Sequence, residues 1–163
     1  MPLFEIQYGG KAQEADSKSQ VVPPAVVLQH VGPLLHVAVA VHPQHAERLI
    51  TQGQQPPEAV TGLALIDTGA SITAVDEAVC QKLGLTPTSV IPMSHAGGSE
   101  QRNCYSIQIL FPGAPLPPMT MPLAASCNLS AGLQPYIVLL GRNLLARMKL
   151  VYNGPRGRIE IAF

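Results

Sequence analysis

The chain has 163 residues, of which 47% are hydrophobic and only 12% are charged. That length fits one domain, or one domain plus an arm, and the composition excludes a chain that is disordered throughout. Ten basic and ten acidic residues give a net charge of zero and form no basic run, which argues against a nucleic-acid partner. Sixteen prolines and fourteen glycines interrupt the apolar runs, a pattern typical of many short strands.

The first 59 residues predict few elements. We expect a strand over Leu3–Tyr8 and a polar linker over Lys11–Gln20. Val21–Val41 holds two apolar runs split by Gly32-Pro33, which predict a hairpin or a bent strand. "HPQHAERLITQG" predicts a helix of one or two turns, with a loop after it. The N-terminus lacks the basic start and apolar core of a signal peptide, and no apolar run reaches the length that spans a membrane. We therefore expect a soluble, cytoplasmic protein without a membrane partner.

From residue 60 onward, the pattern of short strands is clearer. Strands are predicted over Val60–Asp67 and Ser71–Val75, and Asp76 is placed to cap a helix over "EAVCQKL" that ends at Gly84. Strands over Thr86–Ser94 and Tyr105–Phe111 are expected to flank the loop "HAGGSEQRNC". Two more strands are predicted over Met119–Ala125 and Tyr136–Leu140, followed by a short helix over Arg142–Met148. A hairpin with its turn at Asn153-Gly154 closes the chain.

One aspartate stands in a setting that suits acid catalysis. In "LALIDTGASITAV", Leu65 and Ile66 would anchor a strand in the core, so that Asp67 emerges at its end, and Gly69 permits a tight turn. Two adjacent carboxylates cannot both ionise; they share one proton, and the pair can activate water. The chain has a single Asp-Thr-Gly, so the second carboxylate would have to come from a second copy. By itself the tripeptide is also ordinary turn chemistry.

Two segments together resemble a known family. "ALIDTGASITAV" resembles the active-site strand and turn of retropepsin-like aspartic proteases, and "YIVLLGRNLLARMKLVY" resembles the segment and helix that follow the flap in the same family. The resemblance covers Val60 to Phe163, and the sequence is similar to bacterial-type members of the clan. It implies an all-β, closed barrel-like domain with a flap hairpin and one or two short helices. It also implies a homodimer that hydrolyses peptides without a cofactor.

The resemblance assigns roles to individual residues. It implies that Asp67 is the catalytic acid/base and that Thr68, Gly69, Gly141 and Arg142 support it. The residues implied to contact substrate are Ala70 and Ser71 in the groove, and Ala96, Gly97, Gly98 and Ser99 at the flap tip. In this interpretation residues 60–163 form the protease domain, and residues 1–59 are an arm, a dimer brace or a self-cleaved pro-segment.

The sequence departs from the family at one position near the catalytic turn. Retroviral enzymes commonly place an acidic residue after Asp-Thr-Gly-Ala, where it pairs with the arginine of the Gly-Arg-Asn segment. Ser71 occupies that position here, so Arg142 needs another partner or contacts the backbone. This leaves the detail of the dimer contact open, but not the aspartate chemistry.

Other chemistries have weaker support. Five histidines (His30, His36, His42, His45 and His95) complete no metal-binding spacing, because Pro43 separates the closest pair and no cysteine or carboxylate joins them. Cys80, Cys104 and Cys127 form no C-x-x-C motif and are interpreted as reduced thiols, with Cys80 in the core rather than acting as a nucleophile. The serious alternative to a protease is a catalytically silent protease-fold module that binds peptides or dimerises.

Overall fold

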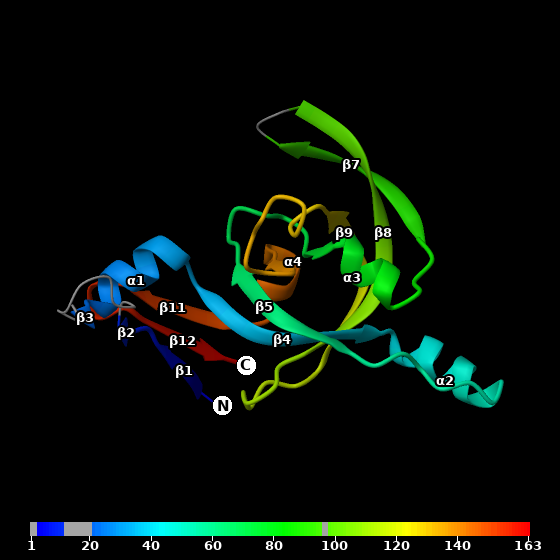
Figure 1. Cartoon of the computed structure of the whole chain (residues 1–163), viewed down its shortest axis with the longest axis horizontal. Helices are drawn as coiled ribbons and strands as arrows, with labels where there is room; N and C mark the ends of the chain where they lie inside the picture. Colours follow the sequence, from blue (N-terminus) through cyan, green and yellow to red (C-terminus); the bar gives the residue numbers. More distant parts are fainter. Residues whose placement is uncertain (1–2, 12–20, 96–97) are drawn as a thin grey trace.

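A computed structural model describes residues 3–11, 21–95 and 98–163, and in these ranges the chain is mostly β-sheet with four short α-helices (Figure 1). This confirms the expected all-β class, although the structure has more helices than the one or two expected. The helices are short, and none in the described part is long and apolar enough to cross a membrane.

The main sheet has seven strands in the order β4-β5-β10-β6-β9-β8-β7. Strand β4 pairs with β5 on one side and, through Ala38–Val41, with β8 on the other, so six of the strands close into a ring. The closed barrel-like architecture is therefore confirmed. The strand bounds are β4 Leu34–Val41, β5 Val60–Ile66, β6 Ala74–Asp76, β7 Ser89–His95, β8 Gly98–Leu110, β9 Met119–Cys127 and β10 Val138–Leu140.

A second sheet joins the two ends of the described chain. Strand β12 (Arg158–Ala162) lies between β1 (Leu3–Gln7) and β11 (Lys149–Asn153), antiparallel to both. The expected first strand and closing hairpin are thus present, and the hairpin turns through a short 3-10 helix, η1 (Gly154–Arg156), instead of two residues. A small ladder joins β2 (Gly10–Lys11) to β3 (Val21–Val22), and residues 12–20 of the expected linker lie outside the described residues.

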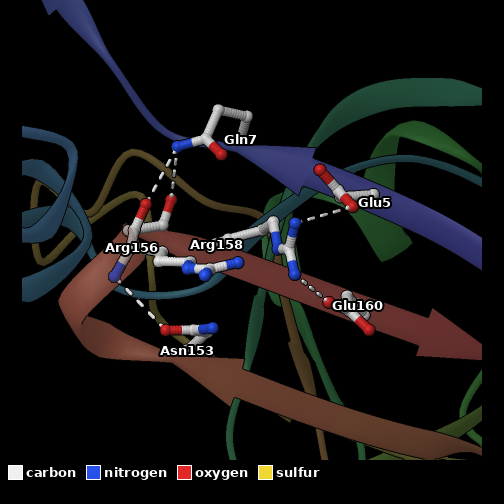
Figure 2. A network of polar contacts seen from close by, with 7 residues as sticks. Glu5, Gln7, Asn153, Arg156, Arg158 and Glu160 are labelled. Atoms are coloured by element: carbon white, nitrogen blue, oxygen red, sulfur yellow. Dashed lines mark hydrogen bonds and ion pairs between the residues drawn. The ribbon is translucent and has the colours of Figure 1, made fainter.

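Polar side chains join β1 to β12 and to the turn of the closing hairpin (Figure 2). Arg158, on the central strand, lies 3.3 Å from Glu5 on β1 and donates to Glu160 at 2.6 Å. The side chain of Gln7 donates to the carbonyl of Arg156 at 3.0 Å. Strands from before residue 60 therefore pair with strands from after it, both here and in the barrel.

The first apolar run of the Val21–Val41 segment is a helix, and the strand predicted there is wrong. Helix α1 (Pro24–Val31) begins with a proline, whose fixed φ suits the first helical turn, and ends at Gly32, whose φ of 75° favours glycine. Leu28 is only 1% exposed, so the helix is held by tertiary packing that a run of valines does not reveal. The second run is β4, as expected.

The other helices lie where the sequence predicts them. Helix α2 (Pro43–Thr51) follows His42, and α3 (Glu77–Lys82) is capped by Asp76, whose carboxylate accepts from the Ala78 N–H. Helix α4 (Arg142–Leu145) is shorter than expected. The core between these elements is aliphatic, as the lack of tryptophan requires, with these side chains among the most buried: Leu28, Val37, Val39, Val75, Ile107, Ile109, Met119, Val138, Leu140, Leu144, Ile159 and Ile161.

Strands β7 and β8 form a long hairpin that projects from the barrel (Figure 1). The loop expected over residues 95–104 is wrong in extent, because pairing continues from Ser89↔Cys104 to His95↔Gly98. The polar residues that suggested a loop belong to a strand that leaves the barrel, and Arg102 forms an ion pair with Glu100 on it. Polarity therefore indicates solvent exposure here and not the absence of a strand.

Candidate active site

Asp67 lies at the point where the chain leaves β5 and turns toward β6. Strand β10 is inserted between these two strands, parallel to β5 and antiparallel to β6. The backbone N–H of Asp67 donates to the carbonyl of Leu140 at 3.0 Å, which continues this pairing by one residue beyond the strand. Ile66 and Leu140 are buried, at 5% and 1% exposure, so the backbone that carries Asp67 is anchored in the core.

The Asp67 carboxylate organises its own turn. Its Oδ1 accepts hydrogen bonds from the N–H groups of Gly69 at 2.9 Å and of Ala70 at 3.2 Å. The side chain is half-buried, and Thr68 and Gly69 are exposed. Within the described part of the chain, Oδ2 has no hydrogen-bond partner. One oxygen thus holds the turn, and the other is free for chemistry.

Arg142 holds the same turn by its backbone carbonyls. Its Nη1 donates to the carbonyls of Thr68 and Gly69, both at 2.8 Å, and its backbone N–H donates to the Ala70 carbonyl at 2.9 Å. Of the two arrangements that the sequence left open, the structure therefore has the backbone contact. The two carbonyls thus accept from Arg142 in place of the acidic residue that Ser71 does not provide.

Gly141 allows the helix after β10 to approach the turn closely. A Cβ on this residue would lie 2.4 Å from the carbonyl carbon of Ile72 and 2.7 Å from the N–H nitrogen of Thr73, too close for any side chain. The glycine is thus required by backbone contact, although its own φ of −81° is ordinary.

Two residues that the sequence analysis did not single out complete this contact. The Asn143 Oδ1 accepts from both the N–H and the hydroxyl of Thr73, each at 2.8 Å, and the Thr73 hydroxyl oxygen accepts from the Gly141 N–H at 3.1 Å. Thr73 is fully buried. Both residues stand inside the two motifs, so the signal was their nearness to Asp67 and Arg142 in sequence.

The residues expected to contact substrate are placed in two groups. Ala70 is half-buried and Ser71 is exposed, both in the Asp67 turn. Gly98 and Ser99 begin β8 and pair with His95 and Ser94 in the hairpin, and no hydrogen bond in the described ranges joins them to the turn. Ala96 and Gly97 lie outside the described residues. Figure 1 shows the hairpin curving back above the loop that follows β5.

A second carboxylate, Asp76, lies at the other end of β6 and has a different environment. It is 1% exposed; its Oδ1 accepts from Ala78 N–H at 3.0 Å and from the Ser130 hydroxyl at 2.9 Å, and its Oδ2 accepts from Ser130 N–H at 2.7 Å. Its backbone N–H also donates to the Ile137 carbonyl at 2.9 Å. Asp76 therefore holds the loop between β9 and β10 near both of its ends, which the helix-cap prediction did not include.

The cysteines have the properties of core residues. Cys80 and Cys104 are fully buried and all three thiols are free. Burial raises the pKa of the Cys80 thiol from 9.0 to about 12, so the nucleophilic thiolate is disfavoured at neutral pH. In the described ranges, no three His, Cys, Asp or Glu side chains are grouped as metal ligands would be.

Comparison with known proteins gives a likeness of fold. No family model matches the sequence, and no curated protein matches it. Fifteen chains of solved structures match, among them the solution structure of simian foamy virus (mac) protease. That protease is 17% identical; the alignment covers 70% of this chain and 92% of the viral one, with a TM-score of 0.41.

Proposed function

We propose that the chain is an aspartic endopeptidase of the bacterial retropepsin-like type, which acts as a homodimer. The carboxylate of Asp67 supports this proposal more than any other feature: it is rigidly held through Oδ1 in a turn braced by Arg142 and Asn143, and its Oδ2 is open. The hydrogen bonds to Oδ1 fix the position of the carboxylate, so Oδ2 is held where it can exchange a proton with a water molecule.

The second carboxylate comes from the partner subunit, because each chain has one Asp-Thr-Gly. A two-fold axis beside the exposed Thr68 brings Asp67 of both chains together, where they share a single proton. The Thr68 hydroxyl is available to hydrogen-bond across this axis. Among the residues that the structure describes, β1 and β11 each pair with β12 alone, so both have an edge to which a second copy can add.

Hydrolysis follows from the shared proton. The ionised carboxylate takes a proton from a water molecule, and the protonated one polarises the scissile carbonyl, as the acid protease pair does. An extended peptide lies between the turn and the β7–β8 hairpin, with its backbone paired and alternate side chains in pockets. Gly98, whose φ is 126°, lets the hairpin bend near its tip as it closes. Residues 60–163 carry this machinery, and residues 1–59 brace it through β1 and β4.

The decisive experiment compares the wild-type chain with Asp67→Asn. Both are incubated with a diverse peptide mixture between mildly acidic and neutral pH, and new termini are identified by mass spectrometry. We expect cleavage by the wild type alone, while circular dichroism shows both folded. Equal cleavage by the variant would refute the proposal, and a folded dimer that cuts nothing would favour the silent peptide-binding module.

Assembly gives an independent test. We expect sedimentation to show dimers whose fraction rises with protein concentration, and activity per chain to rise in parallel. A monomeric species with full activity would contradict a dyad shared between two copies.

A further inference from the structure

A groove of about 410 Å³ opens directly beside the Asp67 turn. One wall is formed by Ser71 and Ile72, which continue the turn, and the other by part of β9 (Thr120–Leu123); Asn143 and Arg147 close it along α4 and the residues after it. The groove thus adjoins the segment that directly follows the proposed catalytic turn.

The β9 wall offers a backbone edge. Strand β6 pairs with β9 only at Ala125–Cys127, so in the described ranges no strand lies beside Thr120–Leu123 on that side. An extended peptide can hydrogen-bond to such an edge and place alternate side chains against the groove. The apolar lining, with Ile72, Pro122 and the 36% exposed Leu123, suits an aliphatic side chain.

The charge of the groove comes from Arg147. No aspartate or glutamate lines this groove, and Arg147 has no ion pair among the described residues. Its guanidinium stands over the ring of Phe163, 5.6 Å from the centroid, a cation–π contact that orients the side chain without neutralising it. A single oriented cation in a groove without acids is complementary to a carboxylate.

We propose that Arg147 selects substrates that carry an aspartate or glutamate beside an aliphatic residue, a few positions from the scissile bond. The occupant of the groove is the peptide itself, in an extended conformation along β9. This inference rests on the proposed function, because the bound peptide is a substrate only if the chain cleaves it. The selection itself is a property of binding and can be measured without hydrolysis.

The test uses the full chain with Asp67→Asn, so that bound peptide is not consumed. Fluorescent extended peptides that are identical except for glutamate or glutamine at one scanned position are titrated, and binding is followed by anisotropy. At one position we expect the glutamate peptide to bind roughly two- to fivefold more tightly, the range of a partly exposed ion pair. High salt should reduce this ratio.

Further substitutions separate charge from shape. Arg147→Gln should bring the ratio to about one, Arg147→Lys should preserve a preference for glutamate, and Arg147→Glu should favour a lysine peptide instead. The matched control is Arg156→Gln, which removes an exposed arginine in η1, at the opposite end of β12 from Phe163 (Figure 2), and should leave the ratio unchanged.

The inference would be overturned by equal binding of glutamate and glutamine peptides at every position, by binding of neither, or by a glutamate preference that persists in Arg147→Gln. If the partner subunit fills the groove, Arg147→Glu would weaken the dimer without changing peptide selectivity, which also refutes it. Cleavage by the wild type is scored separately. A glutamate preference that depends on Arg147, without cleavage, would support this inference and contradict the proposed function. Cleavage without a charge preference would support the proposed function and contradict this inference.

Discussion

Asp67 and Asp76 begin with the same local chemistry and end with different roles. Each lies at the end of a strand and accepts a hydrogen bond from the N–H two residues later, at 2.9 Å in Asp67 and 3.0 Å in Asp76. Ser130, 54 residues away, fills the remaining capacity of Asp76, which is buried. Arg142 instead binds the backbone around Asp67 and leaves one carboxylate oxygen open. The distant partner, not the turn, separates a structural carboxylate from one available for chemistry.

The largest expected effect is on catalysis, and it should be confined to one of the two carboxylates. Asp67→Asn should reduce the rate of peptide hydrolysis about a hundred- to ten-thousandfold, the range supplied by positioned acid–base groups. Asp76→Asn should keep the reaction, because that carboxylate is buried against Ser130. Initial rates of peptide hydrolysis are measured at a temperature where both variants are folded. A similar loss of rate in both would show that Asp67 and Asp76 do not differ in their role in catalysis.

For stability, substitution of Asp76 should have a larger effect than substitution of Asp67. Asp76→Ala removes a helix cap and leaves the Ser130 N–H without its partner, so we expect the free energy of unfolding to fall by about 3 kcal/mol. Asp67→Ala loses hydrogen bonds in a half-exposed turn, where water replaces them, and should cost no more than about 1 kcal/mol. Urea unfolding of both variants measures the difference. Equal losses would mean that the Asp67 turn carries more of the fold than its exposure indicates.

Alkaline pH should affect the region around Asp76. Burial raises the pKa of Cys80 from 9.0 to about 12, and burial together with the Asp76 carboxylate raises the pKa of Cys127 from 9.0 to about 12. Between these values the unfolded chain loses thiol protons that the folded chain keeps, so stability falls as the pH rises. The fully buried Cys80 should contribute up to about 1.4 kcal/mol per pH unit, and the half-buried Cys127 less.

The control for this pH dependence is Cys80→Ala, measured by urea unfolding at several pH values from 8 upward on the same buffer series. Its stability should decline less steeply above pH 9 than that of the wild type. Identical slopes in the two proteins would mean that Cys80 does not stay protonated in the folded state.

The smallest expected effect compares two serines. Ser130→Ala removes the hydroxyl donor to Asp76 but keeps the N–H bond, and should cost about 1 kcal/mol. Ser71→Ala removes an exposed hydroxyl beside the Asp67 turn and should change stability by less than about 0.5 kcal/mol. Thermal unfolding of the two variants side by side resolves the difference. A greater loss of stability in Ser71→Ala would mean that the Asp67 turn, and not the contact between Asp76 and Ser130, stabilises the fold.

The local structure around Asp67 and Asp76 was predictable from the sequence. Asp-Thr-Gly after an apolar run predicts a strand and a turn, and Asp76 before "EAVCQKL" predicts a helix cap; both are present. These predictions depend on neighbours within a few residues. What the sequence did not reveal depends on distant partners: Ser130 on Asp76, Asn143 on Thr73, and the pairing of β4 with β8 that closes the barrel.

The wrong predictions have the same origin. The valine run before Gly32 has a strand composition, but the helix is selected by the packing of Leu28 and by Pro24 at its first turn. The glycines of "HAGGSEQRNC" predict a loop at a hairpin tip, but the polar residues after Gly98 belong to a strand. A hairpin that leaves the barrel is solvated on both faces, so its pattern lacks the alternation that marks a half-buried strand.

The insertion of β10 between β5 and β6 has a consequence for when activity can arise. During synthesis, Asp67 leaves the ribosome about seventy residues before the strand that fixes its backbone and the arginine that holds its turn. Until then β5 and β6 lack the strand between them, and contacts so distant in sequence form slowly. A nascent chain would thus carry its aspartate without an ordered turn. If the proposed function holds, the chain should cleave neither neighbouring proteins nor itself until residues beyond Arg142 have been made.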